Sequence, residues 1–534
     1  MRKEFALISG LLLIGLAALS FLYEWVVWSL VVIGPLILIG IQDAFQKKHA
    51  IRRNFPIFGH FRYLFEAIRP EINQYFVESN TDGVPFSREE RSLVYQRAKG
   101  ELDTVPFGTQ KNVYEIGYEW LNHSIVPTEI HNKDLRVLVG GPHCRKPYSA
   151  SIVNISAMSY GALSKNAIMA LNGGAKDGGF AHNTGEGGLS PYHLASGGDL
   201  IWQIGTGYFS ARNPDGSFCE KKFAEKASLE QVKMIELKLS QGAKPGHGGI
   251  LPGKKVTQEI ADIRGVLVGE DVISPPAHRA FSTPVEMMQF IGKLRELSGG
   301  KPVGFKLCVG NPVELAAICK AMEKTGITPD YIAIDGGEGG TGAAPLEFSN
   351  HIGTPGVESL IFVHNLLKGF GLRDQIRIFA TGKATSGFDV IKRLALGADA
   401  VYMARSMMLA LGCIQALRCN NNSCPTGVAT QDPDLMYGLV VPEKRKRVAT
   451  FHRETVKSIT HMLEAMGLEK PSDLQPWHIQ KRVSTGVVKN YSEIYEYIDT
   501  DSLKVAPVPA SFSYTMRLAD ADSFRVQNPP VNPN

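Results

Sequence analysis

The stretch PVGFKLCVGNPVELAAICKAMEKTGITPDYIAIDGGEGGTG, residues 302–342, carries the clearest fold signal in this chain. Its apolar run over 302–309 is typical of a buried strand. A helix follows, with Asn311 as N-cap and Pro312 in its first turn, and it ends at Gly326. A second short strand over 331–334 leads directly into a glycine-rich run. The order strand, helix, strand indicates a parallel βαβ unit.

The same alternation extends to both sides of this unit. Further strands are predicted over 151–156, 376–380 and 400–403, and further helices from Ser164, from the capping box at Thr283 to Leu297, and over 386–396. Regular alternation with glycine-rich strand ends predicts the α/β class and, more specifically, a (β/α)8 TIM barrel. Residues 190–236 are interpreted as an insertion rather than as a barrel unit.

These patterns divide the chain into four predicted parts. We expect a transmembrane hairpin over 1–50, an N-terminal lead-in over 51–150 and the barrel over 151–440. A helical C-terminal extension over 441–534 follows, and its last eight residues, QNPPVNPN, are expected to be disordered.

The predicted membrane segment runs from Phe5 to Ile41 and contains a single charged residue, Glu24. A bilayer core needs about 20 helical residues, so this stretch fits two spans joined by a turn at 23–25. Basic residues flank both ends of the segment: Arg2, Lys3, Lys47, Lys48, Arg52 and Arg53. This pattern predicts a cell-membrane protein whose larger, C-terminal part faces the cytoplasm. A cleaved signal peptide and a single tilted helix are the alternatives.

Charge and cysteine content argue against two broad classes of protein. The formal net charge is +5, the basic residues are dispersed, and no nucleic-acid-binding motif occurs. We therefore expect no nucleic-acid partner. The seven cysteines lack the spacing of a secreted disulfide framework.

Three of the cysteines, Cys413, Cys419 and Cys424, form the pattern Cys-x5-Cys-x4-Cys. Clustered thiolates favour soft metals such as zinc, copper(I) or iron–sulfur clusters. Structural zinc sites usually have four ligands, and no fourth cysteine or histidine lies nearby, so a three-cysteine cluster fits better. Three unrelated thiols on one loop are the alternative.

Two strand ends are candidates for binding a phosphate group. Thr381-Gly382-Lys383 and Ala404-Arg405 follow the last two predicted strands, where barrels commonly hold a phosphate. Tight turns that need glycine are the alternative. Lys306 lies inside an apolar strand, where its charge requires an anion, either a bound group or a carboxylate of the protein.

Two glycine-rich loops carry charged residues that could contact a substrate. Glu186 lies in NTGEGG, residues 183–188, and Lys244 and His247 lie in KPGHGGILPG, residues 244–253. Loops of this kind over a barrel mouth usually serve ligands. Lys244 together with Arg264 would suit a dicarboxylate. A solvated loop residue is the more ordinary interpretation of His247.

The chain resembles the FMN-binding region of the glutamate synthase large subunit. The resemblance spans residues 151–431 and rests on seven ordered motifs: AMSYGALS (157–164), NTGEGG (183–188), QGAKPGHGGILPGKKV (241–256), ISPPAH (273–278), DGGEGGTGAAP (335–345), ATGKATSGFDV (380–390) and the cysteine run. It implies a (β/α)8 barrel with FMN and a [3Fe–4S] cluster. It also implies hydride transfer from the flavin to C2 of 2-iminoglutarate, which forms from 2-oxoglutarate and ammonia.

The resemblance also implies roles for individual residues. Glu186 matches a glutamate associated with receiving ammonia, and Lys244 and Arg264 match positions that bind the 2-oxoglutarate carboxylates. The flavin would be lined by Ala157, Met158, Ser159 and Gly161, with Lys306 at its pyrimidine edge and its phosphate held by Gly382, Lys383, Ala404 and Arg405. The cluster ligands would be Cys413, Cys419 and Cys424.

The sequence departs from the family pattern at two positions. His247 replaces a glutamate, and Ile250 replaces a glutamine that contacts substrate. Because an apolar side chain cannot replace an amide's hydrogen bonds, a different keto acid or amine is an open alternative, as in the related N-methylglutamate synthase. A non-catalytic electron-transfer subunit is a second alternative.

The family's glutaminase domain and a Rossmann fingerprint for NADPH do not occur in these residues. We therefore expect ammonia to come free or from a partner. Electrons would come from a ferredoxin or a reductase subunit.

Overall fold

The computed structural model describes residues 2–525 and divides into two compact units between Arg88 and Glu89. The predicted disorder of the last eight residues lies outside the described part of the chain. Each unit is described by itself.

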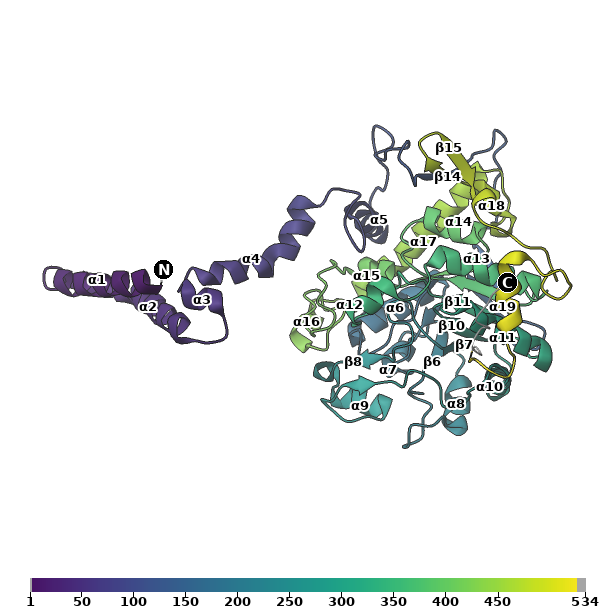
Figure 1. Cartoon of the computed structure of the whole chain (residues 1–534), viewed down its shortest axis with the longest axis horizontal. Coiled ribbons are helices and arrows are strands. Elements are labelled where there is room, and N and C mark those ends of the chain that lie inside the picture. Colours follow the sequence, from purple (N-terminus) through teal and green to yellow (C-terminus); the bar gives the residue numbers. More distant parts are fainter. Residues whose placement is uncertain (1, 526–534) are drawn as a thin grey trace. The chain divides into compact units, whose positions relative to one another are not determined.

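The second unit is built on a closed barrel of eight parallel strands (Figure 1). In spatial order the strands are β4 (Val153–Ile155), β5 (His182–Asn183), β6 (Leu200–Ile204), β7 (Val232–Lys238), β10 (Val303–Leu307), β11 (Tyr331–Ile334), β12 (Arg377–Ala380) and β13 (Ala400–Met403). Pairing of β13 with β4 closes the ring. Chain order and spatial order agree throughout, which confirms the predicted TIM barrel.

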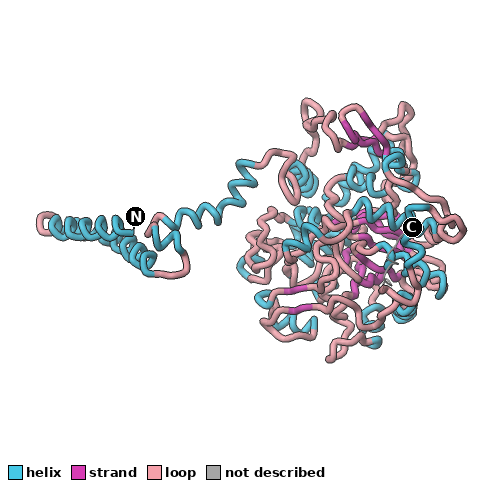
Figure 2. The backbone as a smooth tube through the Cα atoms, viewed as in Figure 1, coloured by secondary structure: helices cyan, strands magenta, loops and turns pink. Residues whose placement is uncertain are grey.

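Helices surround the strands, which gather at the centre of the unit (Figure 2). They are α6 (Lys165–Gly178), α7 (Pro191–Leu194), α8 (Glu220–Ala227), α10 (Pro284–Leu297), α11 (Pro312–Thr325), α13 (Gly356–Gly369), α14 (Gly387–Ala395) and α15 (Arg405–Leu411). The predicted N-caps Ser164, Thr283 and Asn311 all accept a hydrogen bond from the first turn of their helix. Local capping therefore fixes where these helices begin.

The interpretation of residues 190–236 as an insertion was wrong, because this segment supplies two barrel strands, β6 and β7. All five residues of β6 are buried, so the strand lacks the alternation of a half-buried strand. In β7, Glu236 points into the barrel and accepts hydrogen bonds from Asn183 at 2.8 Å and Gln203 at 2.7 Å. The strand β7 therefore carries polar side chains that face a buried network inside the barrel, and its sequence does not show the apolar pattern that predicts a strand.

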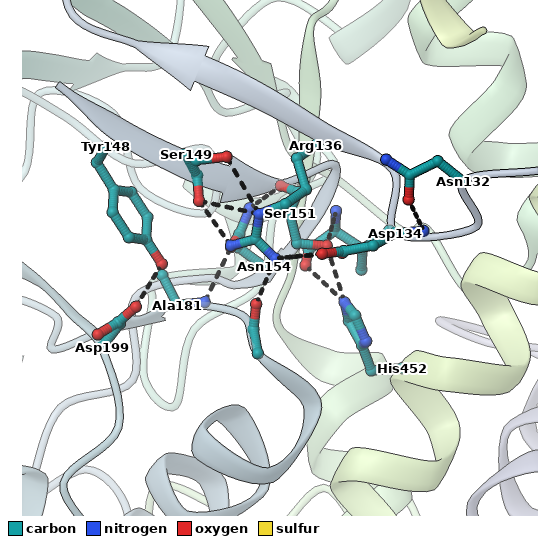
Figure 3. Close-up of polar contacts among 12 residues, drawn as sticks. Asn132, Asp134, Arg136, Tyr148, Ser149, Ser151, Asn154, Ala181, Asp199 and His452 are labelled. Carbon is teal, nitrogen blue, oxygen red and sulfur yellow. Dashed lines mark hydrogen bonds and ion pairs between the residues drawn. The ribbon is translucent and has the colours of Figure 1, made fainter.

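A hairpin of β2 (Arg136–Val139) and β3 (Tyr148–Ser151) covers the amino-terminal end of the barrel. Tyr148 donates a hydrogen bond to Asp199 at 2.8 Å, and Ser151 lies 3.0 Å from Nε2 of His452 (Figure 3). The predicted strand 151–156 is therefore two strands, β3 and β4, with a break at Ile152. This hairpin leaves the opposite end of the barrel as the open one.

The C-terminal extension is only partly helical. The 25-residue helix α17 (Val441–Ala465) packs against α6. A hairpin of β14 (Ile479–Ser484) and β15 (Val487–Asn490) follows and pairs with β1 (Glu119–Leu121), so the prediction of helices throughout 440–500 was wrong. The remaining helices of this unit are α9 (Gln258–Arg264), α12 (Leu346–His351), α16 (Pro433–Tyr437), α18 (Tyr491–Ile494) and α19 (Ala510–Leu518); α5 (Arg88–Lys99) crosses the unit boundary.

The first unit is helical. It contains α1 (Arg2–Ser20), a short 3-10 helix (Glu24–Ser29), α2 (Leu30–Phe45), α3 (Ala50–Asn54), α4 (Gly59–Ile72) and one π turn (Asn73–Val77). Segments Arg2–Ser20 and Glu24–Phe45 are long and apolar enough to cross a membrane. They pack closely, because a Cβ on Gly40 would lie 2.1 Å from the ring of Phe5. The membrane hairpin itself stays a prediction.

Candidate functional site

The open end of the barrel is lined by the glycine-rich loops that follow the strands. The loop after β4 contains Ala157, Met158, Ser159 and Gly161. Met158 N–H donates to the carbonyl of Asn183 at 3.0 Å, which ties this loop to the end of β5. A Cβ on Gly185 would lie 2.8 Å from the backbone nitrogen of Ser159, so only glycine permits this approach.

Glu186 lies at this mouth among three cations. Its Oε2 is 2.8 Å from Nζ of Lys238, and Lys244 and Arg264 act on it electrostatically. Burial disfavours the carboxylate, but the attraction of Lys238 and the other two cations outweighs it and holds the Glu186 pKa below its ordinary value. The cluster has a net positive charge, which suits an anionic substrate.

Lys244 and Arg264 are both nearly inaccessible, at 2% and 5% exposure. Lys244 Nζ donates to the carbonyl of Ala343 at 2.9 Å, and Arg264 Nη2 donates to that of Tyr160 at 3.0 Å. Within residues 2–525, Nε of Arg264 is buried and has no hydrogen-bond partner. Buried donors of this kind usually have a partner, so the guanidinium has a donor available for a ligand.

Glycines shape the space beside these charges. A Cβ on Gly249 would lie 2.5 Å from Oε1 of Glu186, and one on Gly187 would lie 2.6 Å from Nη2 of Arg264. Gly161 has φ of +103° and also borders Arg264. The sequence brings Glu186 and Arg264 together only because no side chain fills these positions.

Lys306 on β10 has a protein carboxylate as partner, which was one of the two alternatives for this residue. Its Nζ lies 3.2 Å from Asp335, which also accepts a hydrogen bond from Thr381 at 2.6 Å. Burial disfavours the ammonium, but Asp335 and then Glu236 outweigh it and raise the Lys306 pKa. The residue is therefore charged at the floor of the mouth.

Lys238 is a site residue that the sequence reasoning missed. It is the register partner of Lys306 on the neighbouring strand, so two buried lysines lie side by side, each with its own carboxylate. Lys238 also donates to Oε1 of Gln241 at 2.9 Å, and in the described part of the chain the Gln241 amide nitrogen is buried without a partner. The strand of Lys238 also contains Lys233 and Glu236, so nothing in the sequence singles out Lys238.

The loop after β12 has the form of an anion-binding nest. Gly382 and Lys383 have φ of +111° and +29°. In the chain segment described here, the N–H groups of Gly382, Lys383 and Ala384 meet no protein acceptor. Successive free N–H groups in such a turn bind anions, so these residues fit the phosphate of FMN.

Ala404 and Arg405 follow β13, the eighth strand, at the predicted position, and their role in binding a phosphate stays a prediction. Arg405 Nη2 donates to the carbonyl of Glu338 at 2.7 Å. A Cβ on Gly340 would lie 2.7 Å from Cδ of Arg405, so the guanidinium is held against the glycine-rich loop after β11.

Cys413, Cys419 and Cys424 lie on one loop after α15, within electrostatic range of one another. Burial raises the pKa of Cys413 to about 12, whereas hydrogen bonds from Thr426 and nearby N–H groups outweigh burial and lower the pKa of Cys424. No group of three or more His, Cys, Asp or Glu side chains among residues 2–525 is arranged to hold a metal ion. In an iron–sulfur cluster each thiolate binds a separate iron, so this finding for a single ion does not test the predicted cluster.

The cysteine loop has a strained backbone. Three residues that are not glycine, Gln415, Leu417 and Asn422, have φ of +56°, +55° and +65°. Each such conformation costs free energy and persists only where its surroundings impose it. The carbonyl of Asn422 accepts a hydrogen bond from Thr430 at 2.7 Å.

Lys255 joins the cysteine loop to the loop after β4. It is 2% exposed, and its ammonium donates to the carbonyls of Ala162 at 3.0 Å and Ala429 at 2.8 Å. Among residues 2–525 it forms no ion pair with a carboxylate, and the nearby groups that stabilise its charge are Cys419 and Cys424. Lys255 is therefore a buried cation placed where it would stabilise negative charge on the cysteine loop.

The two residues that depart from the family pattern lie in the segment that also contains Lys244. Ile250 begins β8 (Ile250–Leu251), which pairs antiparallel with β9 (Val272–Ile273). His247 packs edge-on against Phe348, with ring centroids 5.5 Å apart. His247 forms no ion pair with a carboxylate within the described residues, and Ile250 has no polar side-chain group. Ile250 therefore presents an apolar surface on the same loop as Lys244.

The chain is similar in sequence to proteins of one family. Residues 131–469 match the family model of the conserved region in glutamate synthase. The glutamate synthase large subunit-like protein YerD of Bacillus subtilis is 39% identical over 505 residues, which cover 86% of this chain and 95% of that protein. The archaeal glutamate synthase (NADPH) of Methanocaldococcus jannaschii is 36% identical over 324 residues.

The chain spans 60% of the length of that archaeal relative. Among solved structures, flavocytochrome b2 with sulfite bound superposes with a TM-score of 0.42 at 13% identity, over 86% of this chain and 98% of that one. The family match extends over more than half of the chain, and the YerD alignment over most of it. The chain therefore belongs to the glutamate synthase family.

Proposed function

We propose that this chain is an FMN- and iron–sulfur-dependent oxidoreductase that converts 2-oxoglutarate to glutamate. In the balanced reaction, 2-oxoglutarate, ammonium, two electrons and two protons give glutamate and water. The observation that carries the proposal is the group of three cations around Glu186 at the mouth of a barrel from this family. FMN, when bound, supplies the two-electron reduction at C2.

The protein's own residues would bind and orient the substrate. Lys244 and Arg264 would hold the two carboxylates, with the free Nε of Arg264 as one donor. Glu186, kept ionised by its neighbours, would accept a proton from ammonium and return it during formation of the C=N bond. This site would disfavour a neutral keto compound. Such a compound would displace water from the charged side chains without supplying an opposite charge to compensate for their desolvation.

Several residues would hold the cofactors. The N–H groups of the loop after β12 and the Arg405 guanidinium would bind the FMN phosphate, beside Ala404, and the loop of Ala157, Met158, Ser159 and Gly161 would line the ring. The three cysteines would ligate a [3Fe–4S] cluster. Electrons would come from an external ferredoxin or reductase subunit, with the barrel (151–440) on the cytoplasmic side of a cell membrane spanned by 1–50.

The test uses the purified full-length protein. We expect a flavin absorption spectrum, an EPR signal of an oxidised three-iron cluster, and glutamate formation from 2-oxoglutarate and ammonium with a chemically reduced ferredoxin. Protein without flavin would overturn the proposal. Bound flavin and cluster without glutamate formation would leave either an electron-transfer role or a reaction with another amine or keto acid.

Ile250 favours a second candidate, in which an alkylamine replaces ammonia or another keto acid replaces 2-oxoglutarate. The apolar side chain of Ile250 accommodates a methyl group, whereas the amide of a glutamine at this position would prefer a polar group of the substrate. Turnover with methylamine that exceeds turnover with ammonium at equal concentration would favour this candidate.

Replacing Ile250 with glutamine should shift the selectivity toward 2-oxoglutarate and ammonium. A hydrogen bond to a charged group contributes about 1.5–3 kcal/mol, so kcat/KM should rise at least about tenfold relative to methylamine. Steady-state kinetics with both amines measures the ratio. Ile250→Val, which adds no donor, is the control and should leave the ratio unchanged; an equal shift in both variants would refute a role for the amide.

Lys255→Met should make the cluster harder to reduce. Removing a buried positive charge near two thiolates destabilises the more negative reduced state, so the midpoint potential should fall, on the order of 50 to 100 mV. EPR-monitored redox titration measures it. Lys254→Met removes the adjacent exposed lysine and should leave the potential unchanged. An unchanged potential in Lys255→Met would contradict this assignment.

A further inference from the structure

Helix α4 (Gly59–Ile72) has an apolar face that no other helix of the first unit covers. The face is formed by Phe58, Phe61, Leu64, Phe65, Ile68 and Ile72, which are 37–60% exposed. At 100° per residue these side chains fall within an arc of about 120°. The apolar surface continues into the π turn with Tyr75, Phe76 and Val77. Contiguous apolar surfaces of this kind mark sites of protein or membrane interaction.

Charged residues border one edge of this apolar arc. Arg62 pairs with Glu66 one turn later at 2.7 Å, and Arg69 lies on the same side of the helix. Arg62 and Arg69 flank one edge of the apolar arc. From there their side chains can reach outward while their methylene groups cover apolar surface, as basic residues do at a membrane interface.

The chain that leads into α4 forms a basic cavity of about 810 Å³. Leu36 and Ile39 of α2 supply part of its apolar wall, Lys48 and Arg52 supply its positive charge, and the carboxylate of Asp43 also lines it. The cavity thus adjoins the end of a helix that is apolar enough to cross a membrane.

Arg52 lies in this cavity, and one of its N–H groups has no hydrogen-bond partner among the described residues. Its guanidinium lies 4.6 Å from the centre of the Tyr63 ring, and its Nε is buried without a partner in the described residues. Asp43, 4% exposed, accepts hydrogen bonds from Ile57 N–H at 3.0 Å and from His60 at 2.8 Å, which fixes the start of α4 against the end of α2. Specific contacts within the first unit therefore hold the walls of this cavity in place.

We propose that α4 lies in the interface of an anionic phospholipid bilayer, with its apolar face among the acyl chains and Lys48 and Arg52 bound to headgroup phosphates. Lipid is favoured over a protein partner because one surface combines an exposed phenylalanine-rich face, a basic cavity and the end of a candidate span. Phosphate also matches a guanidinium with a free donor. The first unit would then bind lipid in two ways: basic side chains would contact the headgroups, and apolar helices would contact the acyl chains.

Photo-crosslinking of the full-length protein in its native membrane tests this placement. We expect p-benzoylphenylalanine in place of Phe61 or Phe65 to yield phospholipid adducts, detected by mass spectrometry, several-fold more often than the same residue in place of Glu66. The Phe replacements conserve an aromatic side chain, so the fold is retained. Adducts to the second unit or to another copy of the chain, or equal lipid labelling at Glu66, would overturn the proposal.

A second measurement addresses the headgroup contacts. In vesicles of phosphatidylcholine and phosphatidylglycerol, native mass spectrometry of the full-length protein should show retained phosphatidylglycerol, and Lys48→Glu with Arg52→Glu should remove most of it. Lys133→Glu, at an exposed lysine of the second unit, is the charge control and should have no effect. Equal phosphatidylglycerol retention in both variants would overturn the assignment of Lys48 and Arg52.

Discussion

We expect Cys424→Ser to lose the iron–sulfur cluster and with it the supply of electrons from an external donor. Cys424 is 6% exposed, and hydrogen bonds lower its pKa and so favour the thiolate that iron requires. Removing a residue that hydrogen-bonds to a metal ligand already lowers metal affinity or activity by about 10- to 100-fold. Removing the ligand itself should therefore lower activity at least about 100-fold. Iron content, the EPR signal and ferredoxin-dependent glutamate formation measure the effect.

Cys219→Ser is the matched control. Cys219 lies at the N-cap of α8, where serine is a favoured residue, so this change should leave iron content and activity intact. Flavin content separates the two cofactors, because the nest after β12 lies on a different loop and should still bind FMN in Cys424→Ser. Full iron content in Cys424→Ser would show that this thiol is not a ligand.

The sequence predicted the barrel well where its signals were local. The unit over 302–342 was found almost residue by residue, because Asn311, Pro312 and Gly326 mark both ends of α11. β6 and β7 were missed because a barrel interior that contains Glu236 does not follow a simple apolar pattern. A pattern of hydrophobic residues predicts a strand only when the strand faces apolar surroundings. A strand that faces a polar barrel interior does not show this pattern.

The candidate site was predictable only in part, for a related reason. Glu186 and Lys244 lie in two separate loops and Arg264 ends helix α9, and only the resemblance to the family indicated that they belong together. Lys238 contacts Glu186 directly, yet within its own strand it looks like an unremarkable charge. The role of Lys255 depends on two carbonyls far apart in sequence, and no local pattern contains that information.

Glu186→Gln should reduce both activity and stability. The variant cannot exchange a proton at this position, and loss of a general acid–base group lowers kcat by about 10²- to 10⁴-fold. It also leaves Lys238, Lys244 and Arg264 without their shared carboxylate, and breaking one side of a buried ion pair costs about 3 kcal/mol. Steady-state kinetics and denaturant unfolding at pH 7 measure the two effects. Glu225→Gln, at an exposed glutamate on α8, should change neither.

The pH dependence of stability gives an independent check on the same residue. The pKa of Glu186 is depressed in the folded state, so its contribution to stability is fully present above the ordinary value of 4.5. That contribution is lost as the pH falls through the lower, folded-state pKa. The difference in unfolding free energy between wild type and Glu186→Gln should therefore be constant near neutral pH and shrink in acid. A difference that grows as the pH falls would mean that the three cations do not stabilise the carboxylate, and the proposed substrate site would lose its electrostatic basis.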